Sequence, residues 1–182
     1  MMKKAKYCIV LLFVLFSITV SAQRKQDFFM EAFGASTTFG IHYDSRFSEN
    51  TNWGGRIGLA YTYSNSSNFF DDNPSKTTGV TIPVAVNYLI GKRKHFAEVG
   101  AGISFGWYKC TYRNQHYEME QNVNADFFFL DLGYRFQPAK GLMIRAGINP
   151  GFALNLYEDN HKEHGAQRDA VIYPYLGIGY SF

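Results

Sequence analysis

Bulky apolar residues alternate with small or polar ones along most of the chain, with a repeat of two residues. The alternation is clearest from Phe96 to Tyr112, where the residues between the apolar positions are mainly glycine, serine or charged. Successive side chains of a β-strand point to opposite faces of the sheet, so this repeat predicts strands with one apolar face. Sustained helical periodicity is absent beyond the first 22 residues, and we predict an all-β fold.

The alternation predicts eight strands, at residues 28 to 35, 38 to 47, 54 to 65, 77 to 90, 96 to 112, 123 to 136, 141 to 155 and 170 to 182. Several exceed the usual soluble strand and suit the roughly 9 to 11 residues that a tilted strand needs to cross a bilayer. We therefore predict an eight-stranded antiparallel transmembrane β-barrel. Pro83, Pro150 and Pro174 fall within these strands, and because proline lacks an N–H donor we expect bulges there.

The predicted connections alternate in length. Three are short, at residues 48 to 53, 91 to 95 and 137 to 140, and three are long and polar, at 66 to 76, 113 to 122 and 156 to 169. Short turns at one end and long loops at the other are typical of outer-membrane barrels, whose short turns lie in the periplasm. The first hairpin, from Ala35 to Thr38, is an exception because its outer loop would be unusually short.

The small, glycine-rich face also carries charges of both signs. We predict that it faces inward, because the interior of an eight-stranded barrel is only wide enough for side chains and the apolar face then meets lipid. A soluble eight-stranded lipid carrier, the rival fold, would put its apolar residues inside. The predicted lumen charge cluster consists of Glu31, Arg56, Glu98, Asp131, Arg135 and Arg145, with His42, Asp44 and Arg46 on the same face.

Two interpretations of the lumen charge cluster remain open at this point. The charges form a structural plug of ion pairs, or they line a narrow ion path in which Arg56, Arg135 and Arg145 set the ion preference. Aromatic residues towards the strand ends of the outward face predict interfacial girdles. Phe127 and Phe129 face inward in the predicted register, where an aromatic core cluster is the alternative.

The first 22 residues have the layout of a secretory signal. Three lysines precede an apolar run from Cys8 to Val20, and the small residues Ser21 and Ala22 follow it. The 13-residue run is too short for a bilayer-spanning helix, so we predict a cleaved signal peptide at 1–22 and a barrel domain at 23–182. Cleavage lowers Lys and Arg from 18 to 15, equal to Asp and Glu, which removes the main argument for a nucleic-acid partner. Cys110 then has no internal disulfide partner.

A search for catalytic and metal sites finds no strong candidate. Same-face neighbours on a strand are two residues apart, and none of the five histidines has a serine at that distance. A pairing between strands stays open. The segment from Glu158 to His164 contains two histidines and nearby carboxylates, but it lacks a known zinc-site spacing, and a solvated loop explains it. We expect no catalytic residues, no metal and no cofactor.

The last eight residues, Tyr175 to Phe182, alternate apolar side chains and end on phenylalanine. This ending resembles the assembly signal of outer-membrane barrels, and the segments Val84 to Gly91 and Phe96 to Gly102 are similar to the small OmpX/OmpA-like family. The resemblance implies the outer membrane of a Gram-negative bacterium, reached after export through the periplasm. It also implies insertion by the barrel-assembly machinery, which would read Tyr180 and Phe182.

Three hypotheses about function follow. The first is a noncatalytic, porin-like barrel that serves as a scaffold or surface-interaction protein, using its extracellular loops to contact lipopolysaccharide, a host surface or another ligand. The second is a narrow ion or small-solute channel. The third is a lipid-modifying outer-membrane enzyme, which the absence of a nucleophile beside a base makes the weakest of the three.

Overall fold

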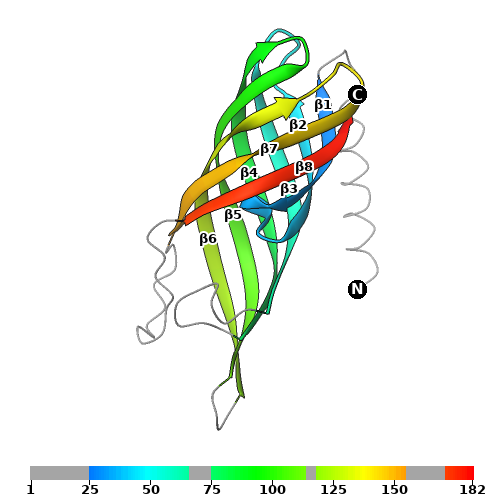
Figure 1. Ribbon diagram of the computed structural model, residues 1–182. Coiled ribbons are helices and arrows are strands. Elements are labelled where there is room, and N and C mark those ends of the chain that lie inside the picture. The colour runs from blue at the N-terminus through cyan, green and yellow to red at the C-terminus, as the bar shows by residue number, and fades with distance from the viewer. Residues whose placement is uncertain (1–24, 66–74, 114–117, 155–170) are drawn as a thin grey trace, which may run out of the picture.

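The protein is a closed antiparallel barrel (Figure 1). A computed structural model describes residues 25–65, 75–113, 118–154 and 171–182. The strands are β1 (Gln26–Phe33), β2 (Phe39–Arg46), β3 (Trp53–Ser64), β4 (Lys76–Lys92), β5 (His95–Arg113), β6 (Glu118–Phe136), β7 (Gly141–Leu154) and β8 (Val171–Ser181). Each strand pairs with the next, and β8 returns to pair with β1. The predicted eight-stranded all-β barrel is confirmed.

The two faces of each strand have opposite character. On β8, Leu176, Ile178 and Tyr180 point outward and are 47 to 59% exposed, whereas Tyr175 and Ser181 point inward and are at most 4% exposed. The other strands also expose large apolar side chains, and their inward positions are mostly polar or small, with a few large apolar exceptions such as Phe29, Phe129 and Met143. The division follows directly from the repeat of two in the sequence, because a closed barrel assigns one face of every strand to its interior.

Glycines on the inward face make room for large inward side chains. A Cβ atom at Gly177 would lie 2.7 Å from Cγ of Arg145, and one at Gly102 would lie 2.6 Å from the Phe129 ring. A Cβ at Gly58 would collide with the His42 ring. The glycine-rich face is therefore the inner face because only glycine leaves enough space beside the arginine, histidine and phenylalanine that fill a narrow barrel.

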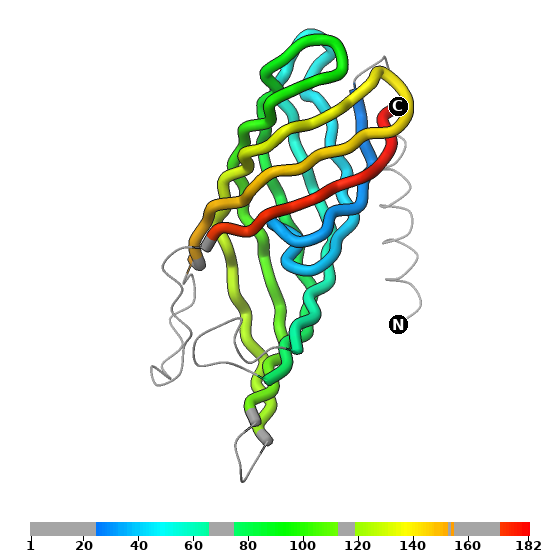
Figure 2. Tube along the Cα trace, viewed as in Figure 1, coloured from blue at the N-terminus to red at the C-terminus, as the bar shows by residue number. Residues whose placement is uncertain are grey.

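The barrel wall is much taller on one side. β4, β5 and β6 contain 17, 19 and 19 residues, whereas β1 and β2 contain 8 each. In Figure 2 the long strands continue well past the others. The predicted long loop at residues 113 to 122 is wrong, because the β5–β6 ladder extends to the pair Arg113↔Glu118. The residues of this segment are mostly polar on both faces of the strand, so the alternation that predicts a strand is absent there.

Prolines interrupt ladders without shifting them. The β3–β4 pairing skips two positions beside Pro83 and resumes in the same register, from Ile57↔Val84 to Ala60↔Thr81. The β6–β7 pairing does the same beside Pro150, and Pro174 lies one residue beyond the last β8 position that pairs with β1. The predicted bulges are therefore wrong, since a few lost hydrogen bonds cost the barrel less than an added residue that would change which face each side chain meets.

The short turns gather at one end of the barrel. They are residues 47–52, 93–94 and 137–140, and the described start and end of the chain lie at the same end (Figure 1). Most residues of the predicted loops at 66 to 76 and 156 to 169 lie outside the described residues, as does the whole predicted signal peptide. Among the residues described, no helix has the length and apolar character needed to cross a membrane.

Replacing Gly177 with leucine should destabilise the barrel by about 1–3 kcal/mol, because the new side chain has to displace Arg145. The neighbouring outward substitution Leu176→Ile, on an exposed position, should change the free energy of unfolding very little. Urea unfolding of both variants, folded in the same vesicles, measures the difference. Equal stability of the two variants would contradict the assignment of the inner face.

Candidate functional site

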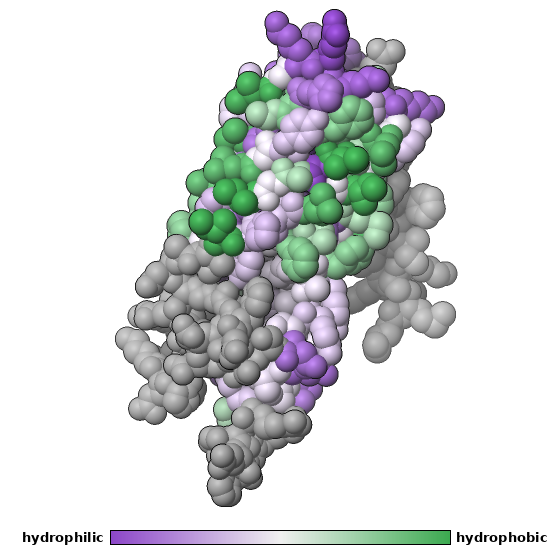
Figure 3. Space-filling model, in the orientation of Figure 1, coloured by the Kyte–Doolittle hydropathy of each residue, from purple (hydrophilic) through white to green (hydrophobic). Residues whose placement is uncertain are grey.

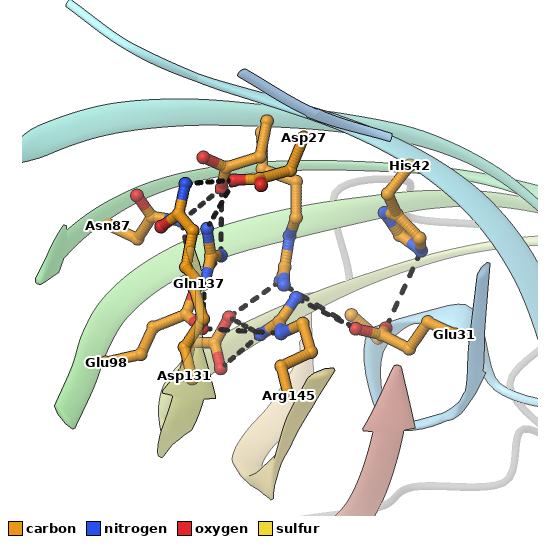
Figure 4. Close-up of polar contacts among 12 residues, drawn as sticks. Asp27, Glu31, His42, Asn87, Glu98, Asp131, Gln137 and Arg145 are labelled. Atoms are coloured by element: carbon orange, nitrogen blue, oxygen red, sulfur yellow. Dashed lines mark hydrogen bonds and ion pairs between the residues drawn. The ribbon is translucent and has the colours of Figure 1, made fainter. Parts of the chain in front are cut away.

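A network of charged side chains occupies the interior. The buried carboxylates are Asp27, Glu31, Asp44, Glu98 and Asp131, and the buried guanidiniums are Arg46, Arg56, Arg135 and Arg145. They project from β1, β2, β3, β5, β6 and β7, so residues far apart in the sequence meet across the barrel. We call these residues, together with His42, the interior charge network. Figure 4 shows its members converging from several strands.

Arg145, on β7, joins three carboxylates. Its Nη2 donates to both oxygens of Asp131, at 2.9 and 2.7 Å, and its Nη1 donates to Oε2 of Glu31 at 3.0 Å. Its Nε lies 3.3 Å from Oε2 of Glu98. The guanidinium also lies over the Tyr175 ring, 4.4 Å from the ring centroid. Hydrogen bonds to both oxygens of Asp131 and to Glu31 fix these side chains in orientation, so this part of the interior is tightly ordered.

Arg135, on β6, forms a second centre nearer the short-turn end. Its Nε donates to Oε2 of Glu98 at 2.9 Å, and its Nη2 donates to Oδ2 of Asp44 at 3.1 Å. Its Nη1 lies 3.4 Å from Oδ2 of Asp27. Glu98 contacts both Arg135 and Arg145, so it connects the two centres into one network.

The two remaining arginines extend the network around the barrel. Arg56, on β3, places Nη2 2.8 Å from Oδ2 of Asp131, and Arg46, on β2, pairs with Asp44. Each buried guanidinium therefore has a carboxylate partner, and each buried carboxylate has a guanidinium partner within 4 Å. Mutual pairing is what makes these charges tolerable where water is excluded.

Neutral polar side chains complete the network at its margins. The Asn87 amide donates to Oδ2 of Asp44 at 2.6 Å and to Oε1 of Glu98 at 3.0 Å. The Gln137 amide donates to Oδ2 of Asp27 at 2.6 Å, and the Ser181 hydroxyl donates to the other oxygen of Asp27. Asp27 therefore ties the first strand to the last strand and to the β6–β7 turn, at the place where the barrel closes.

The β1–β2 connection folds into the barrel. Residues Gly34–Ser36 form a short 3-10 turn, η1, and all three are buried. The Ala35 N–H donates to Oδ1 of Asn149 at 2.9 Å, and the Ala35 carbonyl accepts from the Ser104 hydroxyl at 3.3 Å. This turn explains why the first hairpin has so short an outer loop, and it ends β1 at Phe33 instead of the predicted residue 35.

Backbone conformations at the turn are unusual. Phe33 and Thr37, on either side of η1, have φ angles of 62° and 60°, which residues with a Cβ rarely adopt. Such strain persists where surrounding contacts over-determine the conformation. Here the hydrogen bonds to Asn149 and Ser104 hold the turn inside the barrel.

An apolar layer lies beside this turn. Phe129 is fully buried and contacts Ala35 and Ala85, and the partly buried Phe127 stacks on it with ring centroids 6.4 Å apart. Arg56 lies over the Phe129 ring, 5.8 Å from its centroid. The inward aromatic cluster considered as the alternative for Phe127 and Phe129 is therefore present, and Arg56 joins it to the charge network.

A serine and a histidine meet at the turn, although they are not two residues apart. The Ser36 Oγ lies 2.6 Å from Nε2 of His42 and donates to Oε1 of Glu31 at 3.0 Å. A Ser36 hydroxyl that donates to Glu31 requires the Nε2–H tautomer of His42 at this contact, and that tautomer cannot act as a base toward Ser36. In a hydrolytic triad the carboxylate orients the histidine through Nδ1, whereas here Glu31 contacts the serine. The three side chains are at most 1% exposed, so the arrangement is suited to holding the turn.

The structure brings the six residues of the predicted lumen charge cluster together, each at most 2% exposed. It adds Asp27, which the sequence analysis missed because the first strand was started at residue 28, although the parity of Glu31 places Asp27 on the same face. Asn87 and Gln137 were also missed, since a neutral amide inside a strand or turn gives no distinct signal. Tyr180 and Phe182 are 47 and 52% exposed at the short-turn end of the barrel.

No set of three or more His, Cys, Asp and Glu residues suited to a metal ion occurs within the described ranges. The segment from Glu158 to His164, which was the metal candidate considered from the sequence, lies outside them.

Replacing Arg145 with methionine should destabilise the protein by about 3–5 kcal/mol, because Glu31 loses its closest cation in a water-poor interior. Adding Asp131→Asn in the same chain should recover part of this loss, since one charge of each sign is then removed. Equilibrium unfolding of the single and double variants measures the coupling. Simple additivity of the two changes would contradict a shared network.

The matched control is Lys109→Met, which removes a cation from the exposed pair with Glu120. The two side chains are 52 and 57% exposed, so this change should cost less than about 1 kcal/mol.

Comparison with known proteins gives similarity at the level of fold. No family model matches the chain, and no curated protein matches it. Among solved structures, the N-terminal β-barrel domain of Pseudomonas aeruginosa OprF has a TM-score of 0.51 at 11% identity, covering 87% of this chain and 96% of that one.

Two further solved structures have lower TM-scores, so the comparison rests on OprF. Neisserial surface protein A has a TM-score of 0.45 at 10% identity, covering 87% of this chain and 94% of that one. The attachment invasion locus protein Ail of Yersinia pestis has 0.43 at 14% identity, covering 87 and 96%. The chain therefore has the small eight-stranded barrel fold that its OmpX/OmpA-like resemblance predicted.

Proposed function

We propose that the protein is an integral barrel of the Gram-negative outer membrane, with a plugged interior and a noncatalytic role in surface interactions through its long-loop end. The observation that carries the proposal is the opposite character of the inner and outer faces of the barrel. The interior is filled by paired charges of opposite sign, while the exterior carries large exposed apolar side chains on every strand.

The outer surface supports a membrane location. Large apolar side chains on every strand are exposed, among them Leu59, Val86, Leu132 and Ile178. On the face drawn in Figure 3, hydrophobic side chains form a band, with hydrophilic side chains beyond it at the short-turn end. Soluble proteins rarely expose continuous apolar patches this extensive, and transmembrane barrels require them. A soluble lipid carrier would need an apolar interior, and this interior is charged.

The interior charge network supports the plug over the channel. Arg135 and Arg145 are fully buried and each donates hydrogen bonds to at least two carboxylates, so an ion would have to break several charge-assisted hydrogen bonds to pass. The turn η1 and the Phe129 layer add a second obstruction on the side of the long loops. An eight-stranded barrel leaves little room around such side chains.

The long-loop end supports a role in surface interaction. Beyond Trp107, which is exposed on the outward face, the outward positions of β5 and β6 become polar, with Lys109, Asn122 and Asn124 exposed. This change of character marks the boundary where the wall leaves lipid and enters water. The wall formed by β4 to β6 therefore presents the part beyond Trp107, together with the adjoining loops, to the surroundings.

Insertion by the barrel-assembly machinery through Tyr180 and Phe182, and contact of the outer rim with lipopolysaccharide, belong to this proposal. Both residues lie on the lipid side of the closing strand or directly after it, where an assembly factor can reach them.

Single-channel recording in planar bilayers tests the plug. The refolded protein should insert without discrete conductance steps, because the ion pairs close the lumen, while a porin in the same bilayers provides the positive control. Reproducible openings would show that the interior charge network lines an ion path. Changes in ion selectivity with Arg56→Gln would then locate that path.

Shortening residues 157–168 tests the role of the loops. The truncated protein should unfold at the same urea concentration as the parent, because residues on either side of this segment form the β7–β8 ladder. Attachment of cells displaying the truncated protein to coated surfaces should differ from that of cells displaying the parent. Unchanged attachment together with a destabilised barrel would assign the segment a structural role and contradict the proposal.

A further inference from the structure

The short turns carry a concentration of positive charge. Lys92, Arg93 and Lys94, at the β4–β5 turn, are all exposed, and so is Lys140 in the β6–β7 turn. We call these four residues the basic turn patch. Among the described residues of the short turns, Glu49 of the β2–β3 turn is the single acidic side chain. Figure 3 shows hydrophilic side chains gathered at this end, directly beyond the hydrophobic band.

The backbone fixes the two turns beside one another. Lys92 pairs with His95 across a tight connection in which Arg93 has a φ of 62°. The Gln137 N–H donates to the Lys94 carbonyl at 2.8 Å, which joins the β4–β5 turn to the start of the β6–β7 turn. The main-chain contacts therefore hold the two turns that carry the cations side by side, with little of the cost of ordering a flexible segment.

The patch begins at the level where the apolar band ends. Lys92 occupies the next position in the outward row that contains Tyr88 and Ile90, so its register places it on the lipid side. Its partner His95 has Nδ1 2.6 Å from Oη of Tyr134 and its ring 5.4 Å from that of Phe136. Aromatic side chains of this kind mark the interfacial level of a bilayer, where phosphate groups lie.

We propose that the basic turn patch binds the phosphate groups of anionic phospholipids, such as phosphatidylglycerol, in the leaflet that faces the short turns. The inference rests on the proposed membrane location and adds a headgroup preference to it. Lysine and arginine supply the charge and donors that a phosphate accepts, and clustered cations next to a membrane attract anionic lipid. The lipid-side register of Lys92 and the aromatic neighbours of His95 favour a headgroup over a soluble polyanion.

Electron paramagnetic resonance of spin-labelled lipids tests the proposal. The protein is reconstituted in phosphatidylcholine vesicles that contain a trace of spin-labelled phosphatidylglycerol or spin-labelled phosphatidylcholine. The fraction of each label immobilised by the barrel gives their relative association. We expect about a twofold preference for phosphatidylglycerol, which falls to about one in the variant Lys92→Gln/Lys94→Gln and in high salt.

The matched control is Lys76→Gln/Lys109→Gln, which removes two exposed cations at the long-loop end. It should keep the wild-type preference. Equal association of the two lipids with the wild type, or an equal loss in both variants, would overturn the proposal. Binding of soluble polyphosphate to the detergent-folded protein, without lipid preference in vesicles, would assign the patch to a soluble polyanion and would also overturn it.

Failure of this inference can be distinguished from failure of the membrane proposal. If the protein inserts into the vesicles as a folded barrel but shows no headgroup preference, only the patch assignment is wrong. If it remains soluble and folded without inserting, the membrane location itself is wrong. Insertion is measured separately, by flotation of the vesicles and by protection of the barrel strands from protease.

Discussion

Pairing of opposite charges in a buried interior is the constraint on which this barrel depends. Arg135 and Arg145 are buried completely, and an unpaired charge in such a place costs several kcal/mol. Each must therefore meet carboxylates that come from other strands, as Arg145 meets Glu31 of β1. A register shift of one residue in any of these strands would move its charged side chains to the apolar exterior. The network therefore also stabilises the strand register.

The turn η1 shows how the interior and the connections depend on each other. A hairpin loop usually projects from a barrel, but here Ala35 and Ser36 point inward and replace side chains that a longer strand would have supplied. The cost is an unusual backbone at Phe33 and Thr37. The gain is that Glu31 and His42 obtain a hydroxyl partner in Ser36, which leaves the polar interior better satisfied.

Much of the fold could be predicted from the sequence, because the repeat of two reports directly on which face of a strand is buried. The inward positions of Arg56 and Asp131 followed from parity alone. Their pairing could not be predicted, since the strands that face each other across a barrel depend on tilt and stagger, which leave no local pattern. The inward turn was missed for the same reason, as it depends on contacts with Asn149 and Ser104 of distant strands. The extension of β6 to Glu118 was missed for another reason, since the residues there are polar on both faces of the strand.

The apolar exterior also bears on how such a chain can change over generations. An outward position such as Leu132 or Ile178 contacts no specific partner across the barrel, and lipid accepts any bulky apolar residue there. In the proposed membrane location, outward positions therefore place fewer demands on the identity of their side chains than inward positions, where each residue must fit those that it contacts. The OprF barrel has the same fold at 11% identity, so very different sequences can meet the demands of this architecture.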